Sequence, residues 1–252
     1  MAYTDIDDPS DFFTPHIWNG TSSNHTESIG MQPDLVWVKG RSVATDHTLF
    51  DVVRGFAVGK SLASNTTAAE DGSNTTAYGG IGGVTSDGFT VTAGSSSADY
   101  VNTSGRTYAS WNWKAGTSFS NDASATSVGS IDSAGSVNTT AGFSIITYTG
   151  TGSVGTIAHG LGAVPSMYIL KRRAGGTENW PVYHQSVGNT HALYLNTNDA
   201  KYDYANFTND TSPTSSVFTV GESNDQANPD GSTMIAYCFA EKQGYSKFGS
   251  FI

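Results

Sequence analysis

Short apolar runs alternate with clusters of Gly, Asn, Asp and Ser along the chain. In the run DLVWVK, Leu35 and Trp37 lie on one face of an extended segment. Val36 and Val38 lie on the opposite face, so both faces are apolar, which predicts an inner strand of a two-layer structure. Runs of β-branched and aromatic residues between turn residues are typical of strands, and few segments have the composition of long helices. The pattern therefore predicts an all-β fold.

The stretch TYASWNW has a different alternation. Ala109, Trp111 and Trp113 share one face, whereas Tyr108 and Asn112 lie on the other. Large aromatic residues on one face and smaller ones on the other suit a sheet that packs over a second sheet. About six or seven such short strands in each half of the chain indicate β-sandwich domains with a jelly-roll-like arrangement.

Short sequence motifs in the first half of the chain recur in the second half. PDLVWVKGR begins at residue 33, and PSMYILKRR, which begins at residue 165, has the same pattern of Pro, four apolar or aromatic residues and Lys-x-Arg. Four more matches keep the same order: FFTPHIWNGT with GFSIITYTGT, LASNTT with LYLNTN, SDGFTVTAG with SSVFTVGES, and GRTYASWNWKAG with GSTMIAYCFAEKQG. Matches in one consistent order predict a tandem duplication.

These matches divide the chain into four parts. We expect an acidic N-terminal arm over residues 1–11, a first β-sandwich repeat over 12–116, an extended Ser/Gly-rich connector over 117–141, and a second repeat over 142–252. The final segment GYSKFGSFI resembles the opening strand of the second repeat. Because an unpaired aromatic strand would be an aggregation hazard, this terminal strand is predicted to pair with the second repeat or with a neighbouring copy.

Charge and composition exclude several classes of protein. The 252 residues carry a formal net charge of −10, which argues against binding of nucleic acid through its phosphates. Cys238 is the only cysteine, so no disulfide framework is possible within the chain. The first residues show neither a basic nor an apolar signal region, and no apolar run approaches a membrane span. We therefore expect synthesis in a cytoplasm and no membrane insertion.

Several quoted stretches, among them QPDLVWVK, YASWNWKAGTSFSNDASATSVGSIDSAGSV, GFSIITYTGTGS and AYCFAE, cover nearly the whole chain. Together they resemble a tandem-repeat β-domain family of marine bacteriophage virion structural proteins of the tail or fibre type. The resemblance implies a non-enzymatic virion protein, a tail fibre or appendage that acts in assembly and surface contact. The alternatives are a capsid-surface decoration protein and a glycan-binding host-recognition module.

That resemblance also implies location and partners. We expect the protein in the virion, after assembly in the host cytoplasm, with other virion proteins and further copies of itself as partners. A trimer is the expected oligomer, and a host surface glycan is a candidate ligand. Tyr3 and Ile6 in the acidic arm and Phe248 and Phe251 in the last segment are the candidate assembly residues. The arm is expected to order against another subunit or virion protein.

Signatures of catalysis are absent from the sequence. It has no G-x-S-x-G elbow, P-loop, H-E-x-x-H motif or paired-cysteine metal site, so we predict no enzymatic activity and no cofactor. The motif AHGLGAVP resembles one found in phage fibre domains, and its glycines permit a tight reversal. His159 in this motif is a weak candidate metal ligand; the alternative is a side chain that hydrogen-bonds the turn.

One loop combines aromatic and polar residues in the way that sugar-binding surfaces do. In NTNDAKYDYANFTNDTSP, which begins at residue 196, the candidate contact residues are Tyr202, Tyr204, Phe207, Asp199, Asp203, Asn206 and Asn209. Three interpretations remain open: a loop whose aromatic residues pack back on the sandwich, a contact between subunits, and a glycan site.

Overall fold

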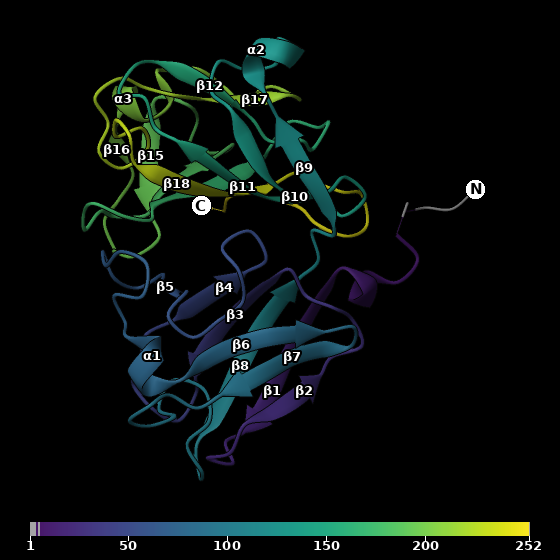
Figure 1. The fold of residues 1–252 in the computed structure, drawn as a ribbon. Coiled ribbons are helices and arrows are strands. Elements are labelled where there is room, and N and C mark those ends of the chain that lie inside the picture. The colour runs from purple at the N-terminus through teal and green to yellow at the C-terminus, as the bar shows by residue number, and fades with distance from the viewer. Residues whose placement is uncertain (1–3, 5, 252) are drawn as a thin grey trace. The chain divides into compact units, whose positions relative to one another are not determined.

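The computed structural model describes Thr4 and residues 6–251, and its fold is all-β with antiparallel sheets (Figure 1). The chain forms two compact units. The first unit spans residues 8–115, and the second comprises residues 116–251 together with Thr4, Ile6 and Asp7. Among the described residues, no helix is long and apolar enough to cross a membrane.

The first unit consists of two facing sheets and two short helices. Its larger sheet has the order β1 (Phe13–Asn19), β8 (Thr107–Trp113), β3 (Leu35–Gly40), β4 (Thr48–Asp51) and β5 (Leu62–Ala63). Its smaller sheet has the order β2 (His25–Ser28), β7 (Gly88–Thr92) and β6 (Gly80–Thr85). A 3-10 helix, η1 (Pro9–Asp11), precedes β1, and α1 (Thr75–Tyr78) precedes β6.

An apolar core lies between these two sheets. Val36 and Val38 from β3 are fully buried in it, as the predicted inner strand requires, and Phe89 from β7 meets them from the smaller sheet. Trp18 and Tyr108, on neighbouring strands, stack with ring centroids 5.5 Å apart. The first unit is therefore sandwich-like, as the sequence predicts.

The second unit has a longer sheet. Its order is β16 (Tyr202–Asp203), β15 (His191–Tyr194), β14 (Pro181–His184), β13 (Met167–Arg172), β18 (Thr233–Phe239), β11 (Phe143–Thr149), β10 (Ser133–Asn138) and β9 (Thr117–Asn121). A two-stranded sheet of β12 (Gly155–Ala158) and β17 (Val217–Val220) also contributes to the core. Two short helices, α2 (Ala123–Thr126) and α3 (Ala205–Thr208), lie in connections.

Five strands follow one another in the same spatial order in both units. The order β1-β8-β3-β4-β5 of the first unit matches β11-β18-β13-β14-β15 of the second. The registers agree as well, because Trp37 pairs with Trp111 and Ile169 pairs with Tyr237. These four residues lie at the positions that the sequence matches place in correspondence.

A fully buried asparagine braces the first unit. Asn102 accepts a hydrogen bond from the backbone N–H of Thr21 through Oδ1 (2.8 Å) and donates through Nδ2 to the carbonyl of Ser23 (2.6 Å). The indole Nε1 of Trp18 donates to the neighbouring carbonyl of Val101 (2.8 Å). These bonds tie the end of β1 to the loop that precedes β8.

The second unit has the same brace. Asn228, also fully buried, accepts from the N–H of Thr151 (2.8 Å) and donates to the carbonyl of Ser153 (2.6 Å). The hydroxyl of Tyr148 donates to the carbonyl of Ala227 (2.6 Å). Each residue here corresponds to its counterpart in the first unit, so the two units share buried hydrogen bonds as well as strand order.

The segment over residues 117–141 differs from the prediction. It was expected to be an extended connector, but it contains β9, α2 and β10, and β10 pairs with β11 over its full length. Gly135 permits this close pairing, because a Cβ there would lie 1.9 Å from the carbonyl oxygen of Ile145. The connector is therefore part of the second unit's sheet. Among the described residues of the first unit, β1 has no such neighbour and is an edge strand.

Residues 244–251 do not form the predicted terminal strand. The chain reverses at Gly244, whose φ is +77°, and Lys242 makes an isolated bridge with Ser246. Beyond this reversal the carboxylate of Glu241 accepts the N–H of Phe248 (2.9 Å). A side chain therefore occupies the backbone donor that a neighbouring strand would use, and no strand is present in the described part of this segment.

The acidic arm also differs from its prediction. Tyr3 lies outside the described residues, but Ile6 is buried with 6% of its surface exposed. Thr4 lies against Gly244, since a Cβ at that glycine would come within 2.1 Å of the threonine methyl. Ile6 is therefore buried by this chain itself, without another subunit.

Candidate functional site

The aromatic residues of the predicted contact loop pack inward. Phe207 is buried in the core beside Tyr168, with ring centroids 5.9 Å apart. Tyr202 and Tyr204 are half-buried and pack against the same core, with their ring centroids 5.1 Å apart. The hydroxyl of Tyr204 donates to the side-chain oxygen of Asn224 (3.2 Å). The structure thus agrees with the interpretation in which the loop packs back on the sandwich.

The polar residues of this loop point the other way. Asp199, Asp203, Asn206 and Asn209 are all exposed. The buried ring of Phe207 is not available beside them, so the loop does not present the full combination of aromatic face and carboxylates that the sequence indicates.

His159 is fully buried and hydrogen-bonds the turn that follows it. Its Nδ1 accepts the N–H of Leu161 (3.2 Å), so Nε2 carries the proton and donates to the carbonyl of Thr214 (3.1 Å). Burial lowers the pKa of this imidazole to about 4. Both nitrogens are engaged, and the described residues contain no cluster of His, Cys, Asp and Glu suited to a metal ion.

Of the candidate assembly residues at the end of the chain, only one packs on the second unit. Phe248 is half-buried and lies 6.1 Å from Phe239 and 6.4 Å from His184, measured between ring centroids. Phe251 is 99% exposed. Phe251 therefore remains available for a contact outside the chain, whereas Phe248 is occupied within it.

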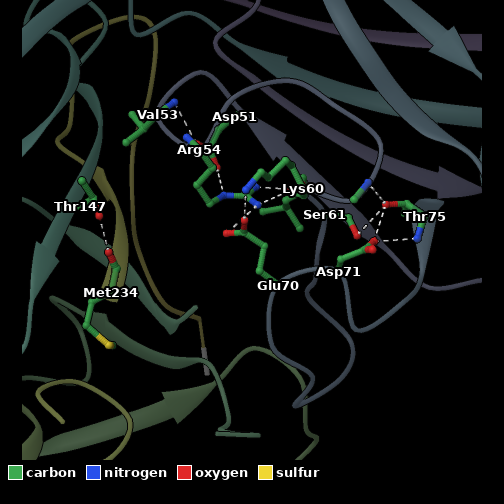
Figure 2. A network of polar contacts seen from close by, with 12 residues as sticks. Asp51, Val53, Arg54, Lys60, Ser61, Glu70, Asp71, Thr75, Thr147 and Met234 are labelled. Atoms are coloured by element: carbon green, nitrogen blue, oxygen red, sulfur yellow. Dashed lines mark hydrogen bonds and ion pairs between the residues drawn. The ribbon is translucent and has the colours of Figure 1, made fainter. Parts of the chain in front are cut away.

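A partly buried ion network holds the loop between β4 and β5 and ties it to the segment after β5 (Figure 2). The guanidinium of Arg54 is fully buried and binds the carboxylate of Asp51 (2.6 Å) and the carbonyl of Leu49 (2.9 Å), and it also donates to the carbonyl of Lys60. Glu70 lies 3.9 Å from the same guanidinium and 3.2 Å from the ammonium of Lys60. This network holds a loop and leaves its charges paired, which is a structural role.

Lys171 is a second buried charge. Its ammonium donates to the carbonyl of Glu178 (2.6 Å) and lies 5.4 Å from the centre of the Trp180 ring. Burial lowers its pKa to about 8, while the nearby Glu178 carboxylate opposes that shift. Lys171 and Trp180 are both fully buried, so the lysine joins a strand to the following loop.

The corresponding place in the first unit is open. A hollow of about 280 Å³ lies on the outer face of the five-stranded sheet and is lined by Trp37, Lys39, His47, Trp111 and Trp113. We call it the tryptophan groove. Trp111 and Trp113 of β8 line this groove, whereas Tyr108, on the opposite face of β8, packs in the core.

Three indole rings form most of the tryptophan groove. Trp37 lies 6.3 Å from Trp111 at an interplanar angle of 65°, and 6.4 Å from Trp113 at 35°. Phe13 supports Trp113 from β1 at 4.9 Å. Trp111 is 39% exposed and Trp37 and Trp113 are half-buried, so the rings form an open aromatic surface.

Two polar side chains, Lys39 and His47, also line the groove. The ammonium of Lys39 donates to the carbonyl of Thr45 (3.1 Å), which fixes its position. The pKa of His47 is lowered by burial and by the positive charge of Lys39, while Asp46 opposes that shift. His47 is therefore neutral at pH 7, and its ring has one donor and one acceptor.

This groove is not among the sites that the sequence predicts. The alternation of TYASWNW shows that Trp111 and Trp113 share a face, but alternation does not tell which face meets the second sheet. The available signal is the second unit, where Ile169, Tyr237 and Phe239 stand in place of the three tryptophans.

Comparison with known proteins identifies a family without assigning an activity. A family model described as "Domain of unknown function (DUF7483)" matches residues 8–252. No curated protein matches the chain, and no solved structure matches it.

Proposed function

The chain belongs to the family described as Domain of unknown function (DUF7483), and we propose that it is a non-enzymatic structural protein of a bacteriophage particle. The family description states no activity, so the proposal is argued from the residues and the geometry of the chain. Its role is that of a tail fibre or appendage that works by assembly and surface contact. Other virion proteins and further copies of the chain, in a trimer, are its partners.

The observation that carries this proposal is the repetition of one structural unit. Both units have the same five-strand order, and buried Asn102 and Asn228 make the same two hydrogen bonds at the same distances. This supports a tandem duplication of one sandwich unit. Repetition of a stable unit extends a protein without a new fold, as elongated particle components require. The jelly-roll-like arrangement stays a prediction.

Three titratable groups with strongly shifted pKa values, those of His159, Lys171 and Cys238, support a structural role. The imidazole of His159 and the ammonium of Lys171 are both buried, and both hydrogen-bond the backbone of nearby loops. Burial raises the pKa of the Cys238 thiol to about 12, which keeps it protonated and unreactive. Catalytic groups are usually perturbed where substrate reaches them, and these three lie in packed interiors.

Electron microscopy of the encoding phage tests the proposal. Gold-labelled antibody against the purified chain should decorate the tail appendages of intact particles. Label spread over the capsid would instead support the alternative of a capsid-surface decoration protein. Absence of label from disrupted and intact particles alike, with the chain present in the infected cell, would contradict a virion role.

A further inference from the structure

The tryptophan groove has the size and lining of a small-ligand site. Its volume of about 280 Å³ is close to the lower end of ligand pockets, which is about 300 Å³. The walls are mostly aromatic, and Lys39 and His47 supply a few convergent polar groups. A site of this size accepts a single ring of a ligand and is too small for a protein element.

The aromatic and polar parts together favour a sugar. The C–H groups on one face of a pyranose ring pack against an indole, whose face is the negative side of its quadrupole. Trp37 and Trp111 meet at 65° and so offer two such surfaces at an angle. The neutral His47 is able to donate to one hydroxyl and accept from another.

The positive charge of Lys39 favours an acidic sugar over a neutral or cationic one. Lys39 donates to one carbonyl, and its ammonium has two further hydrogens for a ligand. None of the five lining residues is acidic, although the whole chain has a net charge of −10. A cationic ligand would be repelled by Lys39, whereas a carboxylate would form a charge-assisted hydrogen bond with it.

In the second unit, the position that corresponds to the tryptophan groove is filled by a side chain. Trp180 takes the position of His47, because the backbone N–H of His47 donates to the side chain of Asn65 (2.8 Å) just as the backbone N–H of Trp180 donates to that of Asn196 (3.0 Å). The large Trp180 ring lies over Lys171, and both are fully buried. The smaller His47 does not fill the corresponding space beside Lys39, and both residues line the groove.

We propose that the tryptophan groove binds an acidic sugar, such as a hexuronic acid unit of a glycan, with its ring on Trp37 and Trp111 and its carboxylate on Lys39. This goes beyond the proposed structural role and does not depend on it. The groove is lined by β3, β8 and His47, the residue before β4, all in the first unit and far in sequence from the loop that begins at residue 196.

Isothermal titration calorimetry of the purified full chain tests this, with trigalacturonate as the probe and maltotriose as its neutral counterpart. We expect saturable binding of trigalacturonate and weaker binding of maltotriose. The Lys39→Met variant should bind trigalacturonate about tenfold more weakly, as expected for loss of one charge-assisted hydrogen bond. His47→Trp, which copies the closed second unit, and Trp111→Ala should both abolish binding.

The exposed Lys201→Met is the matched control and should bind as the unchanged chain does. The proposal is overturned if trigalacturonate gives no saturable heat at millimolar concentration, or if His47→Trp binds it normally. Light scattering supplies one more contrary result: a wild-type oligomer that dissociates in Trp111→Ala would show that the groove is a contact between copies. Because purified protein is used, failure here leaves the particle-labelling test of the structural role unaffected.

Discussion

At the scale of single residues, buried polar side chains determine how the loops are held. Asn102 satisfies two backbone groups and Asn228 three, and Arg54 satisfies two carbonyls and a carboxylate. Removal of such a side chain loses its hydrogen bonds and also leaves the backbone groups that it bound unpaired. Each of these side chains therefore contributes more to the free energy of unfolding than its hydrogen bonds alone would suggest. His159 belongs to the same class, with the difference that its bonds depend on its protonation state.

Replacement of Asn102 should destabilise the first unit. Asn102→Ala leaves the N–H of Thr21 and the carbonyl of Ser23 without their partner, which should cost about 3 kcal/mol of unfolding free energy. Urea denaturation followed by circular dichroism measures the loss. The exposed Asn198→Ala is the control and should change stability little. Equal stability of the two variants would show that Asn102 is not a brace.

His159 should make the protein sensitive to mild acid. Its pKa is about 4 in the folded state against an ordinary value of 6.5, so the unfolded state binds more protons between these values. Stability therefore falls as pH drops through this range, by about 2 kcal/mol between pH 7 and pH 5. Urea midpoints at the two pH values measure this, and His159→Gln, which does not titrate, should lose that part of the slope. Identical slopes in both proteins would rule out His159 as the cause.

At the scale of elements, the strands with dense apolar runs are predictable and those without are not. The run DLVWVK predicts an inner strand because both of its faces are apolar, and β3 lies inside the sheet between β8 and β4 with Leu35, Val36 and Val38 buried. The segment 117–141 is Ser/Gly-rich, and its strands exist because β10 pairs with β11 through backbone groups that no side-chain pattern marks. Residues 244–251 have the aromatic spacing of a strand, but the carboxylate of Glu241 binds the N–H of Phe248.

The last residues should nevertheless stabilise the second unit. Truncation after Gly244 removes the half-buried Tyr245 and Phe248, and it frees Glu241 and Gln185 from the contacts they make with Phe248. We expect a loss of about 1–3 kcal/mol, which thermal unfolding detects as a lower melting temperature. Phe251→Ala, at a 99% exposed position, should leave the melting temperature unchanged. A truncated chain that melts like the full one would mean that the segment contributes nothing.

At the scale of the whole molecule, the division into two units has a direct consequence for folding. Residues 8–115 contain two facing sheets and a core of their own. We expect this segment, expressed alone, to unfold cooperatively and to give a well-dispersed amide NMR spectrum. A collapsed spectrum and a non-cooperative transition would show that the first unit requires the rest of the chain. The tryptophan groove would then form only in the full chain.

The open side of β1 bears on solubility. Pro15 in β1 corresponds to Ile145 in β11, a strand that has neighbours on both sides. Proline has no N–H, so it is compatible with β1 only where that strand has an unoccupied side, and there it removes a donor that an incoming strand would use. Pro15→Val should restore that donor and increase precipitation in concentrated solution, whereas Pro15 keeps crowded, newly made chains from stacking edge to edge.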